Sequence, residues 1–182
     1  MKNIEMKIGD KVPHCKFRVR SLGEWTDTNT DTYFKDKKVI LFALPGAFTP
    51  TCSNQQLPGY EKIHDVFKAH GVDDVYCLSV NDSFVMNAWA KDQNLENVKV
   101  IPDGNGDFSD QMNMLVEKFG AGYGYRSWRY AMIVVNGVIK ELFIEPGKGD
   151  GVKEDPYGES SPENVLKFIQ KHPSVLLDKI DN

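Results

Sequence analysis

The residue best suited to chemistry in this chain is Cys52, in the stretch PGAFTPTCS at 45–53. This cysteine follows the apolar run KKVILFAL, at the point where a buried strand is expected to end and a helix to begin. In the first turn of a helix, unpaired N–H groups and the helix dipole favour the thiolate, the nucleophilic form of cysteine. Cys52 is therefore either a small buried hydrophobic residue or an activated nucleophile, and its neighbours decide between the two.

The residues beside Cys52 favour the nucleophile. Thr49 stands three residues earlier, close enough to aim its hydroxyl at the sulfur. Pro45 and Pro50 stiffen the loop and remove backbone donors that would otherwise need partners. Gly46 permits a close backbone approach.

A thiolate also needs a positive charge nearby, and the segment YRSWRYAM supplies Arg126 and Arg129. A guanidinium suits this role because it is permanently charged and forked. Arg129 stands at the start of a predicted strand, from which its side chain could reach a site at the strand ends. Periodicity alone does not distinguish it from Arg126, and a surface ion pair is the ordinary role of either.

Cys15 and Cys77 fall inside strand patterns, which predicts buried and inert positions. Three widely spaced cysteines without a Cys-x-x-Cys pair argue against a disulfide framework, so we expect reduced thiols. No cysteine or histidine pair has zinc-ligand spacing, and we expect no metal site. The segment DGNGDFSDQMNM begins like a calcium loop but has Phe108 and Met114 where glycine and glutamate are needed, which indicates a turn that caps a helix.

Hydrophobic patterning predicts an α/β fold with a mixed sheet, parallel in its first part and antiparallel in its second. The Asn136-Gly137 dipeptide predicts a hairpin in the second part. A helix beginning after Asn81 or Asp82 should turn Phe84, Val85, Ala88 and Trp89 inward. The predicted strands are 15–20, 39–44, 75–80, 98–101, 130–135 and 138–143, and the other predicted helices are 53–70 and 162–171.

Composition limits the function classes. The 182 residues, 41% of them hydrophobic, suit one domain spanning 1–182. The net charge of -4 and scattered Lys and Arg residues argue against nucleic acid as a partner. No apolar run reaches the roughly 18 residues that span a bilayer, and the first residues have no signal-peptide pattern, so we expect a cytoplasmic protein without membrane contact.

The segment PGAFTPTCS resembles the peroxiredoxin active-site pattern Pro-x-x-x-Thr-x-x-Cys, which falls on Pro45, Thr49 and Cys52. The segments VND-FVMNAW and RSWRYAMIVVNGVIKELFIEP are similar to the type-five peroxiredoxins, most of all to bacterial members that use glutathione and glutaredoxin. Some of those members are fused to a glutaredoxin domain. The resemblance runs from about residue 6 to residue 170 and implies a thioredoxin-like fold, a mixed central sheet flanked by helices.

The resemblance also implies the chemistry, a thiol peroxidase that reduces hydrogen peroxide and organic hydroperoxides without a cofactor. Cys52 would be the peroxidatic cysteine, Arg129 the active-site arginine, Thr49 a hydrogen-bond partner of peroxide and thiolate, and Pro45 a shield against water. The N–H groups near Gly46 and Cys52 would help to stabilise the leaving oxygen. Gly46 and Phe48 are the further candidates for substrate binding.

The oxidised cysteine must be reduced again. The stretch at 145–161, where some relatives carry a resolving cysteine, contains none. We expect an external thiol, glutathione with a separate glutaredoxin; the alternative is thioredoxin with Cys77 as resolving cysteine. By analogy a homodimer is expected, in which Phe48, Phe84 and Trp128 are either contacts between subunits or part of their own core.

Two other classes of function have to be considered. A Cys–His hydrolase would need a histidine beside Cys52, yet His64 lies twelve residues along the predicted helix, about 18 Å if that helix is continuous. A non-catalytic thioredoxin-like module or redox-dependent chaperone would not need Thr49 and Arg129 beside the cysteine. These two residues favour the peroxidase.

Overall fold

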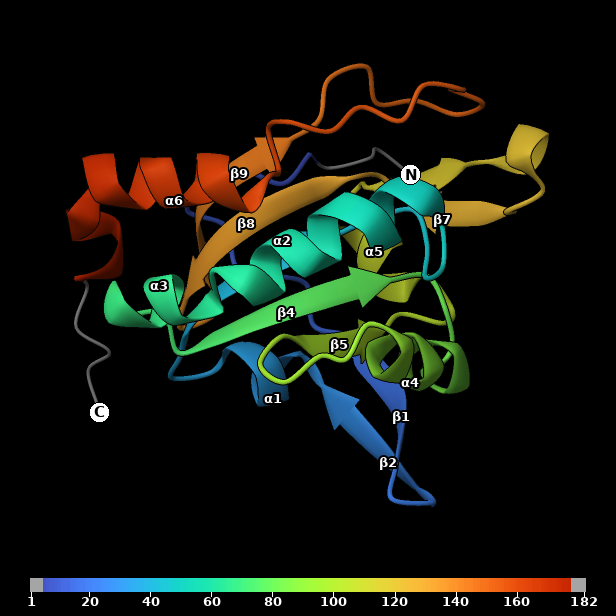
Figure 1. Ribbon diagram of the computed structural model, residues 1–182, viewed down its shortest axis with the longest axis horizontal. Coiled ribbons are helices and arrows are strands. Elements are labelled where there is room, and N and C mark those ends of the chain that lie inside the picture. The colour runs from blue at the N-terminus through green and yellow to red at the C-terminus, as the bar shows by residue number, and fades with distance from the viewer. Residues whose placement is uncertain (1–4, 178–182) are drawn as a thin grey trace.

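The structure is a computed structural model that describes residues 5–177, so residues 1–4 and 178–182 of the predicted domain lie outside it. A five-stranded sheet with strand order β5-β4-β3-β8-β9 runs through its centre (Figure 1). β3, β4 and β5 are parallel, while β8 and β9 are antiparallel to their neighbours, which confirms the predicted mixed sheet. These strands are β3 Lys38–Ala43, β4 Asp74–Ser79, β5 Lys99–Pro102, β8 Tyr130–Val135 and β9 Val138–Ile144.

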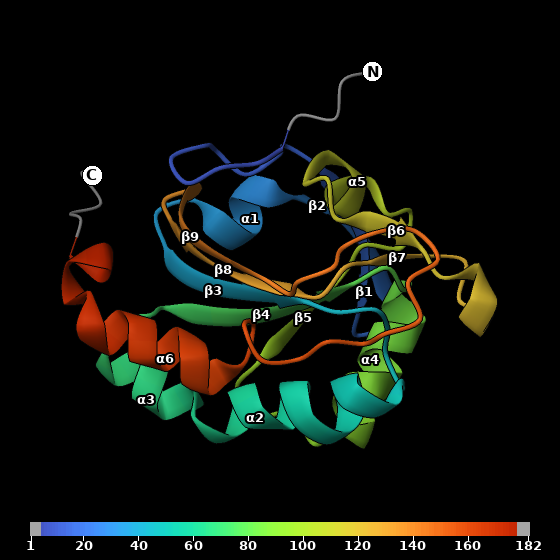
Figure 2. The ribbon, with the colours of Figure 1, turned by 90° about the horizontal axis from the view of Figure 1, so that it is seen from above.

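Helices cover both faces of the sheet (Figure 2). One face carries α2 Leu57–Lys62, α3 His64–Ala69, α4 Ser83–Asp92 and α6 Pro162–Lys171. The other carries α1 Thr30–Phe34 and α5 Asp107–Gln111, which pack with β1 in a second core. The short 3-10 turns are η2 Phe119–Ala121 and η3 Pro173–Leu176. None of the helices within residues 5–177 is long and apolar enough to cross a membrane.

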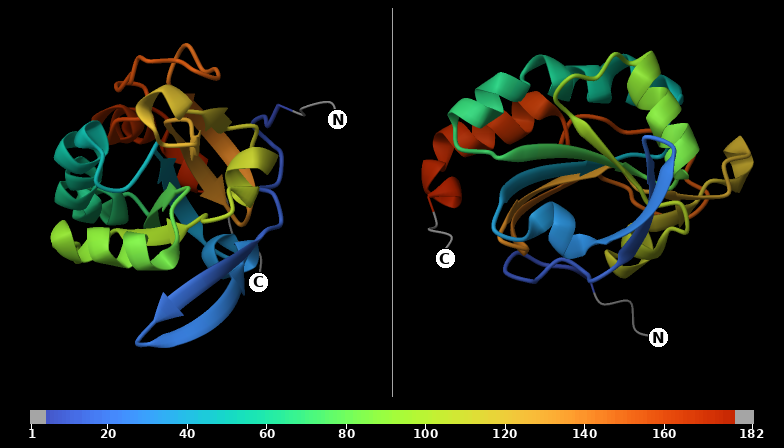
Figure 3. Two further views of the ribbon diagram at one scale, coloured as in Figure 1. Left: turned by 90° about the vertical axis from the view of Figure 1, so that its right-hand side faces the viewer. Right: turned by 90° about the horizontal axis from the view of Figure 1, so that it is seen from below.

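Two further hairpins flank the sheet. β1 Lys16–Ser21 was predicted, but its partner β2 Glu24–Asn29 was not, because the sequence EWTDTN is polar and exposed. This hairpin projects from the body of the molecule (Figure 3). β6 Leu115–Glu117 and β7 Tyr125–Ser127 form the second hairpin, and their three-residue length hides them from periodicity.

The predicted helix at 53–70 is not regular, which corrects the expectation of one continuous helix. It begins with a π-helical segment, η1 Cys52–Gln56, and is interrupted at Ile63, whose φ is -108°. Pro58 offers a reason for the π-turn, since it has no N–H to donate to the carbonyl four residues earlier. The N–H of Leu57 instead bonds the carbonyl of Cys52, five residues back. Cys52 therefore sits in a wide turn.

The inner face of α4 differs from the prediction. Asp82 caps this helix, as expected, and Trp89 is buried, but Met86 is its other large buried residue. Phe84 is 57% exposed and Ala88 is also exposed, so both assignments to the core were wrong. The helix packs against β5 along one narrow stripe, which leaves Phe84 at its edge.

The hairpin between β8 and β9 confirms the Asn136-Gly137 prediction. Both residues have positive φ, 46° and 76°, as a two-residue turn of this kind requires. β8 is buried throughout and pairs with β3, with Ala43 opposite Tyr130. β9 pairs with β8 so that Ile144 also lies opposite Tyr130. The carboxyl end of β3, the start of β8 and the end of β9 therefore lie side by side at one end of the strands.

Candidate active site

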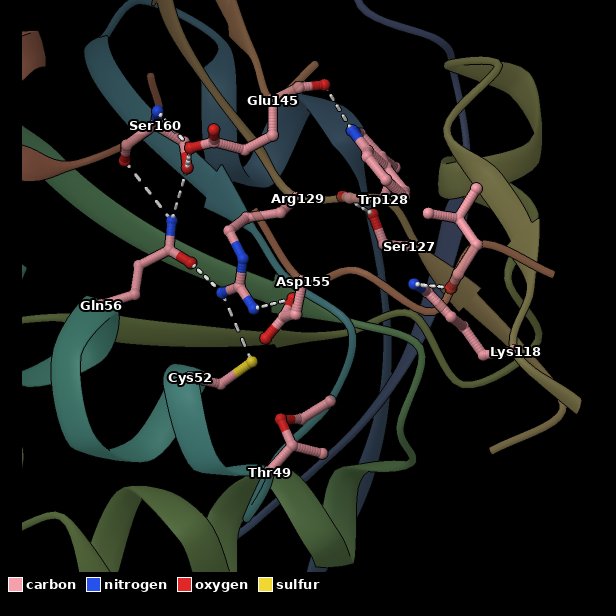
Figure 4. Close-up of polar contacts among 12 residues, drawn as sticks. Thr49, Cys52, Gln56, Lys118, Ser127, Trp128, Arg129, Glu145, Asp155 and Ser160 are labelled. Atoms are coloured by element: carbon pink, nitrogen blue, oxygen red, sulfur yellow. Dashed lines mark hydrogen bonds and ion pairs between the residues drawn. The ribbon is translucent and has the colours of Figure 1, made fainter. Parts of the chain in front are cut away.

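Cys52 lies just beyond the carboxyl end of β3, on the side of the sheet where ligands bind in open α/β folds. The chain leaves β3 through residues 44–49 and turns into the helix that carries Cys52. The Cys52 side chain is fully buried. Its sulfur faces Arg129, which directly precedes β8 (Figure 4).

Arg129 joins three partners. Its Nη1 lies 3.5 Å from the sulfur of Cys52 and 2.5 Å from Oε1 of Gln56, and its Nη2 forms an ion pair of 2.6 Å with Asp155. Burial alone would lower the pKa of this guanidinium, but the charges of Cys52 and Asp155 raise the pKa above its usual value. The Nε–H is buried and has no hydrogen-bond partner within residues 5–177. This N–H is thus available to a ligand.

Arg126 has a different position. It donates from Nε to the carbonyl of Tyr123 at 2.9 Å and from Nη1 to the carbonyl of Pro45 at 3.2 Å. Burial lowers the pKa of its guanidinium, an effect that Tyr123 and Cys52 oppose. A Cβ on Gly46 would collide with Nη1 of Arg126. The close approach predicted at Gly46 is therefore to a guanidinium that braces the loop, while Arg129 is the arginine at the sulfur.

Of the other predicted site residues, some lie at the site and one does not. Pro45 and Thr49 line a cleft beside the site. The Thr49 hydroxyl donates to the carbonyl of Gly46 at 2.8 Å rather than to the sulfur. Phe48 has a φ of 63°, is 53% exposed and does not line that cleft.

A buried polar chain behind Arg129 was not predicted. Gln56 donates to the Ser160 hydroxyl at 3.1 Å, and that hydroxyl donates to the carboxylate of Glu145 at 2.8 Å. Because the Gln56 amide nitrogen must face Ser160, its oxygen faces Arg129 (Figure 4). Helical spacing alone could have found Gln56, four residues after Cys52 and on the same face. Ser160 and Glu145 are joined to it only by tertiary folding.

The two remaining cysteines lie in the core, as predicted. Cys77 is fully buried in β4 and belongs to the same hydrophobic cluster as Cys52. Burial, and then the charge of Cys52, raise the pKa of Cys77 well above its usual value. Cys15 lies in the cluster on the other face, where burial and the carboxylates of Asp103 and Asp107 raise its pKa to about 11.

The remaining candidates from the sequence have structural roles. Asp103 accepts hydrogen bonds from the N–H groups of Phe108 and Ser109, so its segment caps α5 as predicted. His64 begins α3, which continues along the sheet away from Cys52 (Figure 1). Its ring is buried, and Nδ1 lies 3.5 Å from the carboxylate of Asp65 without a hydrogen bond among the described residues. Nothing in this arrangement pairs His64 with Cys52.

A cleft of about 350 Å³ opens beside the site. Three segments line it: the loop before Cys52, the turn after β6 and the stretch before Asp155. The lining residues are Pro45, Thr49, Pro50, Lys118, Gly120, Ala121, Tyr123, Gly151, Val152, Lys153 and Asp155. Asp155 belongs to both the cleft and the Arg129 ion pair. A small molecule in the cleft would therefore lie beside the Thr49 hydroxyl and the carboxylate that holds Arg129, while the Cys52 sulfur is buried behind the lining.

Comparison with known proteins gives consistent matches. A family model described as Redoxin matches residues 7–160. A peroxiredoxin of Rhizobium etli is 53% identical over 174 residues, which cover 91% of this chain and 97% of the relative. The hybrid peroxiredoxin hyPrx5 of Haemophilus influenzae is 50% identical over 161 residues, which cover 88% of this chain and 65% of that longer protein.

Solved structures agree with these relatives. The Plasmodium falciparum antioxidant protein, described as a 1-Cys peroxiredoxin, is 40% identical with a TM-score of 0.88 over 91% of this chain and 99% of its own. Reduced Prx3 of Vibrio vulnificus, in complex with hydrogen peroxide, is 38% identical with a TM-score of 0.83 over 92% and 98% of the two chains.

Proposed function

This chain belongs to the redoxin family as a peroxiredoxin, a thiol peroxidase of thioredoxin-like fold, and from that premise we propose that Cys52 is its peroxidatic cysteine. Arg129, Thr49 and Pro45 complete the active site in this proposal. Hydrogen peroxide and organic hydroperoxides are the substrates, and glutathione with a separate glutaredoxin is the reductant. The observation that carries the proposal is the 3.5 Å contact between Nη1 of Arg129 and the Cys52 sulfur.

That contact gives each group a role in the first half of the reaction. The Cys52 thiolate, stabilised by the guanidinium, attacks one oxygen of the hydroperoxide. The S–O bond forms as the O–O bond breaks, and the other oxygen leaves as hydroxide or alkoxide and takes up a proton. The free Nε–H of Arg129 can donate to this oxygen as its charge develops. Cys52 is left as a sulfenic acid.

The neighbouring residues support this step. The Thr49 hydroxyl, now bonded to the carbonyl of Gly46, keeps its lone pairs for an O–H of the peroxide. Pro45 lines the entrance and offers no N–H to bind water there. Arg126 holds the Pro45 carbonyl and so fixes the loop. For Gly46 and Phe48 we propose loop geometry, not substrate contact, as the role.

The second half restores the thiol. One glutathione thiolate attacks the sulfenic sulfur, forming a mixed disulfide as hydroxide leaves and becomes water. A second thiol, from glutaredoxin or another glutathione, displaces the first and yields oxidised glutathione. Two observations support an external thiol: residues 145–161 contain no cysteine, and a relative with 40% identity is described as a 1-Cys protein.

The alternative is reduction by thioredoxin after a Cys52–Cys77 disulfide has formed. Its support is that both residues belong to one hydrophobic cluster. The raised pKa of Cys77 argues against it, because a buried thiol that stays protonated is a poor attacking group. Three free thiols also fit the reducing cytoplasm, where we propose that the protein acts.

The further proposed partner is a second copy of this chain, with which it would form a homodimer. Phe48 and Phe84 are both more than half exposed, and the segments that carry them are joined by a hydrogen bond from the Ala47 N–H to the side chain of Asn81, just before α4. Trp128 is only 2% exposed and packs in its own chain, so it is not a contact in this proposal.

The test is intact-mass spectrometry of the reduced protein after one equivalent of hydrogen peroxide, with a sulfenic-acid trap present, beside Cys52→Ser. We expect one trapped adduct on the wild type and none on the variant. A loss of two mass units without adduct would instead indicate the Cys77 disulfide. No reaction in the wild type would refute the assignment of Cys52.

A further inference from the structure

We propose that the 350 Å³ cleft beside Cys52 is the binding site of glutathione in the recycling step, an inference that rests on the proposed function. The ligand class is a small peptide thiol with two carboxylates and one ammonium. The cleft would hold these charges while the sulfur reaches Cys52.

Position is the first argument. Thr49, Pro45 and Asp155 line the cleft, and each also belongs to the surroundings of Cys52. Thr49 is joined to the helix that carries Cys52, since its carbonyl accepts the N–H of Ser53 at 3.0 Å. The volume lies in the usual range for small-molecule sites, although hydrogen peroxide itself needs far less room. The size of the cleft therefore points to a second, larger ligand.

Charge is the second argument. Lys153 is exposed at the mouth of the cleft, and its ammonium has no hydrogen bond or ion pair within residues 5–177. Lys118 is 8% exposed, and its ammonium donates to the carbonyl of Val152 at 2.9 Å (Figure 4). Asp155 uses one oxygen on Arg129, and the other accepts no hydrogen bond in the described part of the chain. The two lysines of the cleft could bind the two carboxylates of glutathione, and the free oxygen of Asp155 could bind its ammonium.

Rigidity is the third argument. The wall at 150–153 is tied to β6 by the Gly151 N–H to the carbonyl of Glu117 at 2.9 Å and by the Glu117 N–H to Asp150 at 2.8 Å. The Lys118 bond to Val152 adds a third tie. A preformed wall loses little conformational entropy on binding, which favours a dedicated site over a transient gap.

The competing occupant is the alkyl chain of an organic hydroperoxide. The prolines, Ala121 and Val152 would suit such a chain. A hydrocarbon chain makes no use of the charges of Lys118, Lys153 and Asp155, whereas glutathione uses all three. The charges decide in favour of the peptide thiol.

The experiment is a single-turnover measurement on the full chain. Cys52 is first oxidised with one equivalent of hydrogen peroxide, and the rate of mixed-disulfide formation is followed by intact mass at increasing glutathione concentration. Lys153→Glu should raise the half-saturating glutathione concentration about 3- to 10-fold, the effect of reversing one exposed charge at a contact. Lys167→Glu, an equal change of charge on the exposed face of α6, should leave it unchanged.

Two further measurements separate recognition from reactivity. Reduction by dithiothreitol, an uncharged thiol, and oxidation by hydrogen peroxide should proceed at wild-type rates in Lys153→Glu. Ala121→Trp, which places a bulky side chain in the cleft wall, should slow glutathione more than it slows dithiothreitol. Together these results would assign charge and shape recognition to the cleft.

Each other result has a definite meaning. If glutathione reduces wild type and Lys153→Glu with the same concentration dependence, the site is elsewhere while the proposed reductant stands. If Lys153→Glu or Ala121→Trp slows an organic hydroperoxide but not glutathione, the occupant is the hydroperoxide. If glutathione does not reduce the wild type although dithiothreitol does, the proposed reductant fails and this inference fails with it.

Discussion

Arg129 holds the sulfur of Cys52, the amide oxygen of Gln56 and the carboxylate of Asp155 at the same time. A forked, planar guanidinium can meet partners in three directions, and it stays charged although its side chain is only 1% exposed. The Gln56 contact is itself oriented by Ser160 and Glu145. The positive charge at the sulfur is therefore fixed in direction as well as in sign.

Replacing Arg129 by lysine keeps the positive charge but removes the forked geometry, so it tests which of the two the reaction needs. We expect Arg129→Lys to lower the second-order rate constant for hydrogen peroxide about 10²- to 10³-fold, because an ammonium cannot keep all three contacts. Stopped-flow tryptophan fluorescence measures this rate, and circular dichroism checks the fold. Arg18→Lys, at an exposed ion pair on the β1–β2 hairpin, is the matched control and should react like the wild type. An Arg129→Lys rate within twofold of the wild type would contradict the assigned role.

The three thiols should differ in their response to pH. The pKa of Cys15 is raised to about 11, and burial raises that of Cys77 well above its usual value, so both stay protonated near neutral pH. Alkylation by iodoacetamide at about pH 8 should thus label Cys52 first. Labelling of Cys15 should grow about tenfold per pH unit toward pH 11, because the thiolate is the reactive form. Peptide mass spectrometry assigns the sites; early labelling of Cys77 would instead favour its role as resolving cysteine.

Among individual residues, the sequence alone offered candidates within one short segment, the resemblance added Arg129, and the residues behind Arg129 were missed. Cys52, Thr49 and Pro45 lie within eight residues, so helix and turn chemistry describe them. Periodicity did not distinguish Arg126 from Arg129, while the family resemblance pointed to Arg129, whose Nη1 lies 3.5 Å from the sulfur. Asp155 comes from an irregular loop with no periodic signal, and only the structure brings it to the guanidinium.

The parallel strands are joined at the end opposite to Cys52 by one carboxylate. Asp74, at the start of β4, bonds Lys37 before β3 at 3.0 Å and Lys99 in β5 at 2.7 Å. It also accepts from the Tyr76 hydroxyl at 3.1 Å. Burial alone would raise the pKa of Asp74, but the hydrogen bonds from the two lysines lower it below its usual value.

We expect Asp74→Asn to lower the free energy of unfolding by about 1 to 3 kcal/mol, because it leaves two lysines without their anion. The pH dependence follows from the sign of the shift. A lowered pKa contributes stability above about pH 4, and that contribution is lost as the pH falls through the lower, folded-state value. Urea unfolding at neutral and acidic pH measures both effects.

The control for Asp74 is Asp27→Asn. Asp27 pairs with Arg18 at 2.8 Å, but both side chains are more than half exposed, and such pairs contribute little. It should change the unfolding free energy by less than about 0.5 kcal/mol. Equal effects of the two substitutions would mean that Asp74 does not hold the strands together.

Among the elements, the buried strands and the capped helices were predictable, and the exposed or short ones were not. β3 is apolar on both faces, and α6 begins at the Ser161 cap followed by Pro162, signals that need no tertiary information. β2, β6 and β7 are held by pairing with neighbours rather than by their own pattern. The apolar spacing of the helix gave no sign of the π-turn at Cys52, and Pro58, which has no N–H, was the one local signal for it.

At the scale of the whole molecule, Trp25 and Phe84 form an exposed aromatic patch, and Phe48 in the loop before Cys52 is a third exposed aromatic residue. Phe84 and Trp25 meet edge to face at 5.4 Å, and all three are more than 40% exposed. Exposed aromatic residues grouped in this way are typical of protein interfaces. The proposed homodimer would cover them.

Phe84→Asp should shift the protein toward the monomer, because a charge cannot be buried in such a contact without cost. Sedimentation velocity across a dilution series measures the shift. Leu22→Asp, at the fully exposed tip of the β1–β2 hairpin and outside the patch, should leave the equilibrium unchanged. A wild-type protein that stays monomeric at every concentration would remove the dimer proposal.

The central sheet separates the thiols: Cys15 lies in the core on one face, while Cys52 and Cys77 lie in the core on the other. On the proposed route only Cys52 is oxidised, by two electrons, and each chain needs two thiols from outside before it can react again. Peroxide clearance is then set by the supply of reductant and not by the supply of enzyme. When that supply runs short, the sulfenic acid persists and a second peroxide can drive it to the sulfinic acid. The fraction of protein inactivated in this way would record how far the thiol pool of the cell had been depleted.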